Sequence, residues 1–561
     1  MRRLLTLFAA LLTTTLALWA NTIDRESARD KAKQLLGKPV SEVAAYQAGA
    51  RSSSALSDGE DAYYMFNATD GPGFVILSAE DALGTVLGYS YDEQLPTDGR
   101  LPDALHQLLD VFSQITADFR NGSISAPTKA SAHYLQGVPA LIRTRWDQGT
   151  PFNNLCPVID EKHCLTGCVA TAIGQIMKYW EWPVTGKGYA SATVESEVVH
   201  GSLEHAYQWE LMRNTRDELM ESEPSATAVA ELLYDCGLSV GMNYGLETSG
   251  SNLTLRALYA NFGYIPTTLR TLRRDCYSSD EEWLQILRNE LDNGRPIYYT
   301  ARSKVDGSTE AVGHAFVIDG YDSSSLLHVN WGWGGYCNGY FDLSLASGNG
   351  QVFNLNQAAT IGIEPAKNGE TGTPIEYPYM EMKPTCDRTG TISKSVDFSI
   401  TVGGFWNYTS TSHSWTVSIG IYDINNKMLG DAKKRGGGVA ALNLDPNYGY
   451  HDVYGTVICN LSSKTLANGH YALRVVLNEK NINILPDMAG GQENNAVYIQ
   501  VNGSNITFTD GTAYKEAALA AGISVVEYSP DASQKYYDLQ GRPVANPGRG
   551  IFIRDGRKVI R

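Results

Sequence analysis

The feature that most constrains the fold of this chain is a short, strongly apolar segment that begins directly after Gly167. Apolar residues recur there at helical spacing, and Pro183 prevents the helix from continuing. These residues are Val169, Ala172, Ile173, Ile176 and Met177. Because Gly167 permits a tight turn just before them, we predict a buried helix whose N-terminus lies at Cys168.

A cysteine at the N-terminus of a helix has a chemical advantage. Backbone N–H groups and the helix dipole stabilise the thiolate, which is the form of cysteine that acts as a nucleophile. The commoner fate of a single cysteine is to be a small residue of the core. Cys168 alone therefore indicates a nucleophile without excluding a structural role.

The second informative residue is His314, near the start of an apolar run that ends at Tyr321. The run predicts a buried strand, and a histidine in such a place is, taken alone, more often structural. A thiolate, however, needs a neighbouring imidazole that forms an ion pair with it and later protonates a leaving amine. Together, Cys168 and His314 predict a nucleophile and its general base.

A second strand, Leu326 to Val329, follows a polar turn and leads into a segment rich in Gly and Trp. If the two strands pair as a hairpin, Asn330 or Trp331 comes near His314. The Asn330 side chain would then fix the tautomer of the imidazole, and the tryptophans would shield that contact from water. The alternative is a turn that only packs against the core.

Gln148 lies upstream of Cys168, in a polar segment. A glutamine amide can donate a hydrogen bond to a developing oxyanion, together with the backbone N–H of the nucleophile. Without Cys168 and His314, Gln148 would be an ordinary loop residue.

Charge and cysteine content exclude several classes of protein. The 561 residues include 45 Lys and Arg against 61 Asp and Glu, a formal net charge of −16. Such a protein has no general attraction to nucleic acids or anionic membranes. Among the eight cysteines, the cluster of Cys156, Cys164 and Cys168 lacks the paired spacing of zinc modules, so we predict no metal site and no cofactor. A Cys156–Cys164 disulfide that leaves Cys168 free is the better interpretation.

The N-terminus has the pattern of a secretory signal peptide over residues 1–20. Arg2 and Arg3 precede an apolar run from Leu4 to Trp19, and Ala20 stands before polar residues. The run is short for a membrane span, although an unprocessed anchor is the alternative. No other stretch approaches the length of a spanning helix, so we predict a secreted protein.

Three larger regions follow the signal segment. Residues 21–137 contain a predicted helix from Arg25 to Leu36, a hairpin over 62–78, an amphipathic helix from Leu101 to Phe119 and a polar linker near 121–130. Residues 138–365 hold the chemistry. In residues 366–509 short strands alternate with polar turns, which predicts a β-sandwich-like domain, and residues 510–561 form a short β tail.

Three segments of the middle region resemble the streptopain family of secreted cysteine peptidases. They are GCVATA with QIMKY at 167–179, GHAFVIDG at 313–320 and HVNWGWGG at 328–335. GFVILS at 73–78 and LGYS at 87–90 are similar to the propeptide of that family. The resemblance implies an α+β fold, in which a papain-like peptidase domain of helical and β-barrel-like halves follows an α+β inhibitory propeptide.

The resemblance also implies roles for individual residues. Cys168 would be the nucleophile, His314 the general base and acid, and Gln148 the oxyanion donor. The substrate-binding loop is similar to the segment that ends at Ser251, and Gly313 would offer its backbone to substrate.

Two partners follow from the same resemblance. Family members are made as zymogens, so the propeptide is an expected intramolecular inhibitor. The last fifty or so residues resemble the C-terminal secretion or sorting tails of exported Bacteroidetes proteins, which implies an outer-membrane secretion machinery as a partner.

We therefore predict a secreted cysteine endopeptidase, made as a zymogen, that hydrolyses proteins or peptides of a host or of the environment. A different Cys-His acyl-transfer enzyme, transglutaminase-like or an amidase, would usually have an acidic third residue where Asn330 and Trp331 stand. A non-catalytic surface adhesin would use only the β-rich region, and the presence of every catalytic residue type argues against it.

Overall fold

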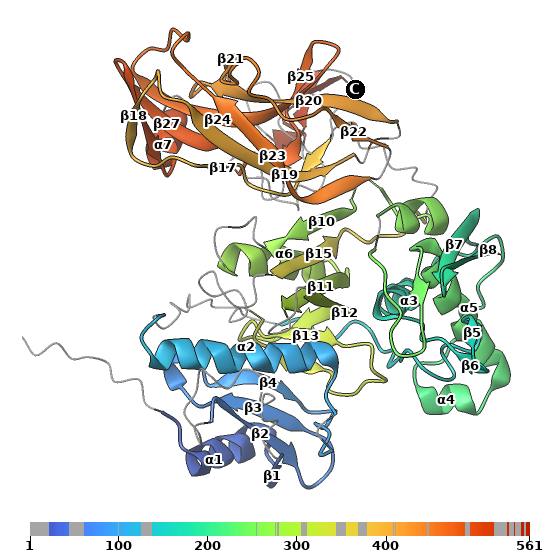
Figure 1. Ribbon diagram of the computed structural model, residues 1–561. Coiled ribbons are helices and arrows are strands. Elements are labelled where there is room, and N and C mark those ends of the chain that lie inside the picture. Colours follow the sequence, from blue (N-terminus) through green and yellow to red (C-terminus); the bar gives the residue numbers. More distant parts are fainter. Residues whose placement is uncertain are drawn as a thin grey trace, which may run out of the picture.

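The computed structural model shows an N-terminal α+β unit, a central unit with a helical part and a sheet, and a C-terminal β-rich unit (Figure 1). The described residues are 22–43, 61–98, 100–124, 137–253, 255–266, 268–274, 277, 280–304, 311–343, 355–367, 378–407, 409, 411–445, 448–488 and 494–520, with four short strands between 536 and 560. The predicted signal peptide and most of the predicted linker lie outside the described residues.

The N-terminal unit folds as its sequence pattern indicates. Its elements are α1 (Arg25–Leu36), β1 (Val40–Glu42), β2 (Tyr63–Ala68), β3 (Phe74–Ser78), η1 (Asp81–Leu83), β4 (Val86–Ser90) and α2 (Asp103–Arg120). Asp24 caps α1 by accepting a hydrogen bond from the Ser27 N–H, and Gly37 ends the helix with a φ of 62°. Strands β2 and β3 pair as the predicted hairpin, with Tyr63 opposite Ser78.

The central unit has a helical part and a sheet. The helical part contains α3 (Cys168–Trp180), α4 (Arg216–Met220), α5 (Glu223–Ser239) and η2 (Ala257–Asn261), with the short strands β5 (Val158–Ile159), β6 (Lys162–His163), β7 (Tyr189–Val194), β8 (Glu197–Ser202) and β9 (Asn243–Tyr244). The sheet contains β10 (Arg270–Arg273), β11 (Ile297–Lys304), β12 (Ala311–Tyr321), β13 (Leu327–Asn330), β14 (Gly339–Phe341) and β15 (Leu355–Ile361), and α6 (Asp280–Asp292) packs against it. Helix α3 packs against both α5 and β12, so it joins the two parts.

The N-terminal and central units share one ten-stranded sheet, in the order β1-β2-β3-β4-β14-β13-β12-β11-β15-β10. The two units meet where β4 pairs with β14, with Gly88 opposite Phe341. A Cβ atom on Gly88 would lie 2.6 Å from the Phe341 ring, so only glycine permits this close approach. Helix α2 lies against the central unit, as Figure 1 shows, and its apolar side chains belong to the same continuous core.

The C-terminal unit is a β-sandwich with its own core. One sheet contains β16 (Tyr379–Met380), β17 (Thr385–Cys386), β19 (Phe398–Trp406), β23 (Gly449–Cys459) and β26 (Asp487–Met488). The other contains β18 (Thr391–Ser393), β20 (His413–Tyr422), β21 (Met428–Asp431), β22 (Leu442–Leu444), β24 (Gly469–Glu479), β25 (Ile482–Ile484), β27 (Val497–Asn502) and β28 (Asn505–Thr509). Phe398, Ile400 and Val402 of β19 are buried in the core, whereas Val396 precedes the strand and is 40% exposed.

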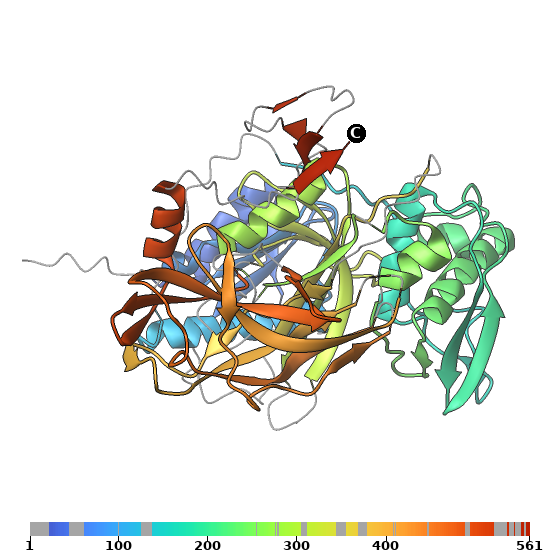
Figure 2. The ribbon, with the colours of Figure 1, turned by 90° about the horizontal axis from the view of Figure 1, so that it is seen from above.

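After the sandwich, helix α7 (Thr512–Ala520) packs against β24, and Figure 2 shows it on the outer side of this unit. A small sheet formed by β29 (Tyr536–Tyr537), β30 (Pro543–Val544), β31 (Ile551–Arg554) and β32 (Arg557–Ile560) follows. In the described part of the chain, no helix combines the length and the apolar character that crossing a membrane requires.

Candidate active site

Cys168 is the first residue of α3, and Gly167 is the N-cap of that helix with a φ of 85°. A Cβ atom on Gly167 would lie 2.8 Å from the Met242 Cε and 2.9 Å from the Ser249 carbonyl oxygen. The positive φ and the close neighbours together require glycine here. The glycine therefore sets the position from which the Cys168 side chain leaves the helix N-terminus.

His314 lies in β12, where it pairs with Ala301 of β11, and its side chain is 7% exposed. Its imidazole forms a hydrogen bond with the partly buried Cys168. Burial raises the pKa of the Cys168 thiol, but the charge of His314, its hydrogen bond, and the Ala315 and Val169 N–H groups together bring that pKa below its usual value. The structure thus places a thiol of lowered pKa beside an imidazole.

The second ring nitrogen of His314 contacts a backbone carbonyl. Nε2 of His314 lies 3.3 Å from the carbonyl oxygen of Trp331. The expected direct contact between the Asn330 side chain and the His314 imidazole is not made in this structure. Asn330 lies opposite Val317 in the β12–β13 register, and its amide is bound to other groups, namely the Thr144 carbonyl, Gln175 and the Gly332 N–H.

The side chain of Trp331 anchors the carbonyl that His314 contacts. The indole Nε1 donates to the Cys337 carbonyl at 3.0 Å, and the ring packs against Phe316 and Phe341. The residue is 1% exposed. This packing excludes water from the back of the His314–Trp331 contact, as expected for a shielding tryptophan.

Gln148 lies next to the turn that leads into Cys168. Its backbone carbonyl accepts a hydrogen bond from the Thr166 N–H at 3.0 Å. The half-buried side-chain amide makes no hydrogen bond with any residue of the described part of the chain. The amide therefore remains available as a donor to an oxyanion.

The two predicted substrate-binding residues flank the site on different segments. The loop before Ser251 is tied to the segment before Cys168, because the Leu165 N–H donates to the Gly245 carbonyl at 3.1 Å. The Ser251 hydroxyl itself donates to the Val240 carbonyl, so it supports the loop. Gly313 is exposed and directly precedes His314 on β12, where its backbone is accessible to a ligand.

One buried residue next to the site was not predicted from sequence. Gln175 of α3 is fully buried and accepts hydrogen bonds from the Thr144 hydroxyl and from the Asn330 amide. The signal that pointed to it was a polar amide inside an otherwise apolar helical segment, because a buried amide must find partners.

The other cysteines among the described residues are free and form no disulfide. Cys156 and Cys164 are both free and buried, so the disulfide interpretation of this pair is wrong in this structure. Burial raises the pKa of the Cys156 thiol to about 12, which contrasts with the lowered pKa of Cys168. Among the described residues, no group of three His, Cys, Asp or Glu side chains is placed to hold a metal ion.

Comparisons with known proteins agree with this geometry. A model of the peptidase C10 family matches residues 146–341, and a model of the Spi protease inhibitor matches residues 20–116. Streptopain of Streptococcus pyogenes is 32% identical over 369 residues, which cover 58% of this chain and 89% of streptopain. The thiol protease/hemagglutinin PrtT of Porphyromonas gingivalis is 30% identical over 402 residues, which cover 66% of this chain but only 45% of PrtT.

Two solved structures from Prevotella intermedia are also similar. A prointerpain A fragment is 30% identical, with a TM-score of 0.47, and the match covers 55% of this chain and 98% of that chain. The active cysteine protease interpain A is 33% identical, with a TM-score of 0.38, and the match covers 42% of this chain and 98% of that chain.

Fold and site therefore define a papain-like thiol peptidase that carries an inhibitor-type propeptide. The chain belongs to the peptidase C10 family, as its relation to streptopain shows. The predicted family, the α+β fold class and the assignment as a cysteine peptidase zymogen are thus confirmed.

Proposed function

We propose that the chain is a secreted endopeptidase in which Cys168 and His314 carry out the hydrolysis of protein substrates. The observation that supports these roles most directly is the hydrogen-bonded pair of a low-pKa thiol and an imidazole at the N-terminus of a buried helix. The proposed domains are a signal peptide at 1–20, a propeptide at 21–137, the peptidase at 138–365, the sandwich at 366–509 and a tail at 510–561.

In the first half of the reaction, the Cys168 thiolate attacks the carbonyl carbon of the scissile peptide bond. The negative charge moves to the carbonyl oxygen, where the Gln148 amide and the Cys168 backbone N–H stabilise it. The tetrahedral intermediate then collapses and the C–N bond breaks. His314 gives its proton to the leaving amine, and the acyl group remains on Cys168 as a thioester.

In the second half, water replaces the amine. Neutral His314 takes a proton from the water, whose oxygen attacks the thioester carbon. The C–S bond breaks, the carboxylic acid product leaves, and the thiolate and imidazolium are restored. The Trp331 carbonyl accepts the Nε2 proton of His314 throughout, which holds the other nitrogen toward the sulfur atom.

The propeptide inhibits intramolecularly, and its contacts with the peptidase explain how it stays in place. Besides the β4–β14 pairing, the Tyr89 hydroxyl donates to Asp322 at 2.9 Å and Glu93 forms an ion pair with Arg145 at 2.8 Å. Arg145 is in the segment that leads to Gln148, so the propeptide contacts the segment that carries the proposed oxyanion donor. Export through the signal peptide and use of the tail by an outer-membrane machinery remain part of the proposal.

The test of the proposed nucleophile compares two cysteine variants of the full-length precursor. Cys168→Ala should abolish both casein hydrolysis and self-processing with an unchanged melting temperature. Cys386→Ala is the matched control, because Cys386 is a partly exposed free cysteine of the sandwich and should be dispensable. Casein hydrolysis by a folded Cys168→Ala precursor would contradict the assignment.

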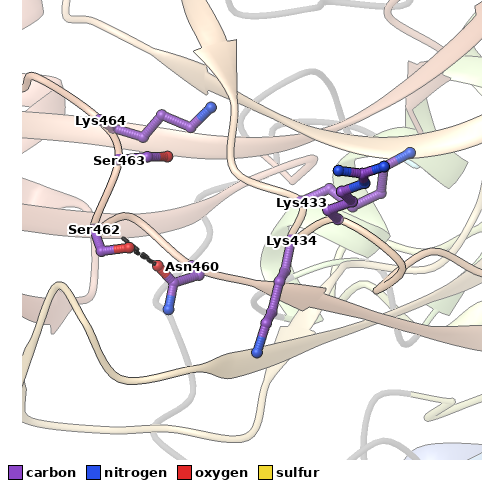
Figure 3. Close-up of a pocket in the computed structure, with 7 residues that line it drawn as sticks. Lys433, Lys434, Asn460, Ser462, Ser463 and Lys464 are labelled. Carbon is purple, nitrogen blue, oxygen red and sulfur yellow. Dashed lines mark hydrogen bonds between the residues drawn. The ribbon is translucent and has the colours of Figure 1, made fainter.

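A second, separate function is supported by the sandwich, namely binding of an anionic polysaccharide. A pocket in this domain is lined by Lys433, Lys434, Arg435, Asn460, Ser462, Ser463 and Lys464 (Figure 3). Lys434 forms an ion pair with Asp397 at 2.5 Å, whereas Lys433, Arg435 and Lys464 have no ion-pair partner among the residues that the structure describes. Backbone hydrogen bonds from Lys434 to Ile458 and from Asn460 to Ala432 hold the two lining loops together.

The composition of the lining indicates the class of ligand. Three cations without an ion-pair partner line the same pocket and repel one another, and a bound oxyanion would reduce this repulsion. The lining contains no aromatic side chain for stacking bases and no apolar side chain for an acyl chain. Sulfate esters on a hydrophilic polymer fit this surface best.

A further inference from the structure

A pair of buried amides connects the three segments that supply the proposed catalytic groups. Gln175 lies on α3, two turns after Cys168, and is 0% exposed; Asn330 ends β13 and is 2% exposed. The Asn330 Nδ2 donates to the Gln175 Oε1 at 3.1 Å, and the Gln175 Nε2 donates back to the Asn330 Oδ1 at 3.3 Å. The two side chains therefore form a reciprocal amide pair between helix and sheet.

The same pair also holds the segment that contains Gln148. The Gln175 Oε1 accepts from the Thr144 hydroxyl at 3.0 Å and from the Trp146 N–H at 3.3 Å. The Asn330 Nδ2 donates in addition to the Thr144 carbonyl at 2.8 Å. A displacement of this amide pair would thus move the nucleophile helix and the oxyanion segment relative to each other.

The peptide group between Trp331 and Gly332 links the amide pair to His314. Its N–H donates to the Asn330 Oδ1 at 3.1 Å, and its carbonyl oxygen lies 3.3 Å from the His314 Nε2. Because a peptide group is planar, fixing the direction of its N–H also fixes the direction of its carbonyl. Gly332 has a φ of 73°, a conformation that glycine adopts without strain, so the chain can turn here while the peptide group keeps both contacts.

We infer that Gln175 is a positioning residue of the active site: through Asn330 it holds the 331–332 peptide group, which orients His314 toward Cys168. The inference rests on the proposed roles of Cys168 and His314. Gln175 touches neither substrate nor reacting atoms. Its effect should appear in the rate of the chemical step and in the ionisation of Cys168, and less in the binding of substrate.

The test uses Gln175→Met, which keeps the size of the side chain and removes every hydrogen bond. The precursor is processed in trans with a small amount of wild-type enzyme, so that a defect in self-processing does not prevent the measurement. We expect kcat to fall by about 10- to 100-fold with KM within about threefold, since small misplacements of catalytic groups have effects of this size. The pH midpoint of Cys168 alkylation by iodoacetamide should rise.

Gln357→Met is the matched control. Gln357 is also a buried glutamine of the peptidase unit, and it accepts a hydrogen bond from the Tyr299 hydroxyl at 2.6 Å. Among the residues that the structure describes, no hydrogen bond joins it to the site. It should lower the melting temperature to a similar extent while kcat and the alkylation midpoint stay at the wild-type values. Equal losses of kcat in the two variants would overturn the inference, and so would an unchanged kcat in folded Gln175→Met.

Gln175→Glu provides a second readout if the methionine variant does not fold. A protonated glutamic acid can donate to Asn330 as the amide does, whereas the carboxylate cannot. Activity relative to wild type should therefore be highest at acid pH and decline as the buried acid ionises. A ratio that does not depend on pH contradicts the inference, whereas activity in Cys168→Ala would contradict the proposed function itself.

Discussion

At the residue scale, the lowered pKa of Cys168 results from several opposing effects. Burial in a low-dielectric site disfavours the thiolate, and on that ground alone this cysteine would be inert. The imidazole of His314 and two backbone N–H groups reverse that outcome and lower the pKa. Cys386 shows the contrast, because burial raises its pKa without an imidazole to compensate.

This contrast predicts the pH dependence of thiol alkylation. In the processed enzyme, Cys168 should react with iodoacetamide at a lower pH than Cys386, since a lowered pKa leaves more thiolate at any pH below the usual value. His314→Ala should shift the Cys168 midpoint upward and leave that of Cys386 unchanged. Mass spectrometry of the alkylated peptides across a pH series measures both sites in one sample, and an unshifted Cys168 midpoint in His314→Ala would contradict the assignment.

At the element scale, the decisive contact is the pairing of β4 with β14, which makes the propeptide part of the peptidase sheet. Strand β14 is an edge strand of the peptidase, and edge strands accept further strands through their unpaired backbone groups. The pairing brings Gly88 against the Phe341 ring at a distance that tolerates no side chain. We therefore expect inhibition to depend on this one backbone position as well as on side-chain contacts.

Gly88→Val tests this dependence. Overpacking of a tight contact costs about 1–3 kcal/mol, so the propeptide should bind less tightly by about 5- to 150-fold. The precursor should convert to the processed form correspondingly faster in a gel time course. Ser41→Val is the control, because Ser41 is exposed on β1 at the far edge of the sheet. Identical half-times for the two variants would show that the β4–β14 contact does not restrain the propeptide.

At the scale of the whole molecule, the charge of the basic pocket is opposite in sign to the net charge of the chain. The chain carries a net charge of −16, yet four cationic side chains line one pocket of the sandwich, and of these Lys434 is paired with Asp397. General solubility does not require such a cluster, because mixed charges serve it better. We therefore favour the explanation that the cations form a binding site for a negatively charged ligand.

The prediction is that heparin, a sulfated polysaccharide, binds this pocket. We expect the Lys433→Gln, Arg435→Gln, Lys464→Gln triple variant of the inactive Cys168→Ala precursor to bind at least about tenfold more weakly, and salt to weaken wild-type binding. The control triple variant removes an equal number of positive charges from the same domain, at Lys427, Arg388 and Lys480. Calorimetric titration compares them. Equal losses in both triples would indicate unspecific attraction, and binding of anionic vesicles but not heparin would contradict the ligand class.

Much of the local structure was predictable, because it depends on interactions between neighbouring residues. The spacing of apolar residues in 168–180, the helix from Arg25 to Leu36 and the 62–78 hairpin all appear where the sequence places them. Chemistry was predictable for the same reason: a cysteine after a glycine at a helix start and a histidine at the start of a buried strand are local patterns. The sequence therefore predicted the candidate site as a set of residue types.

Sequence by itself determined which residues are the candidates for the chemistry and their order along the chain, since helix starts, strand periodicity and turn residues depend on neighbouring residues. Only the tertiary structure decided that the carbonyl of Trp331, and not the amide of Asn330, contacts His314. It also decided that Gln175 meets Asn330 across 155 positions of the chain, and that the propeptide joins the sheet at β14. Such contacts depend on strand register and on which buried polar groups become hydrogen-bond partners. Both are fixed only when segments that are distant in the sequence pack together.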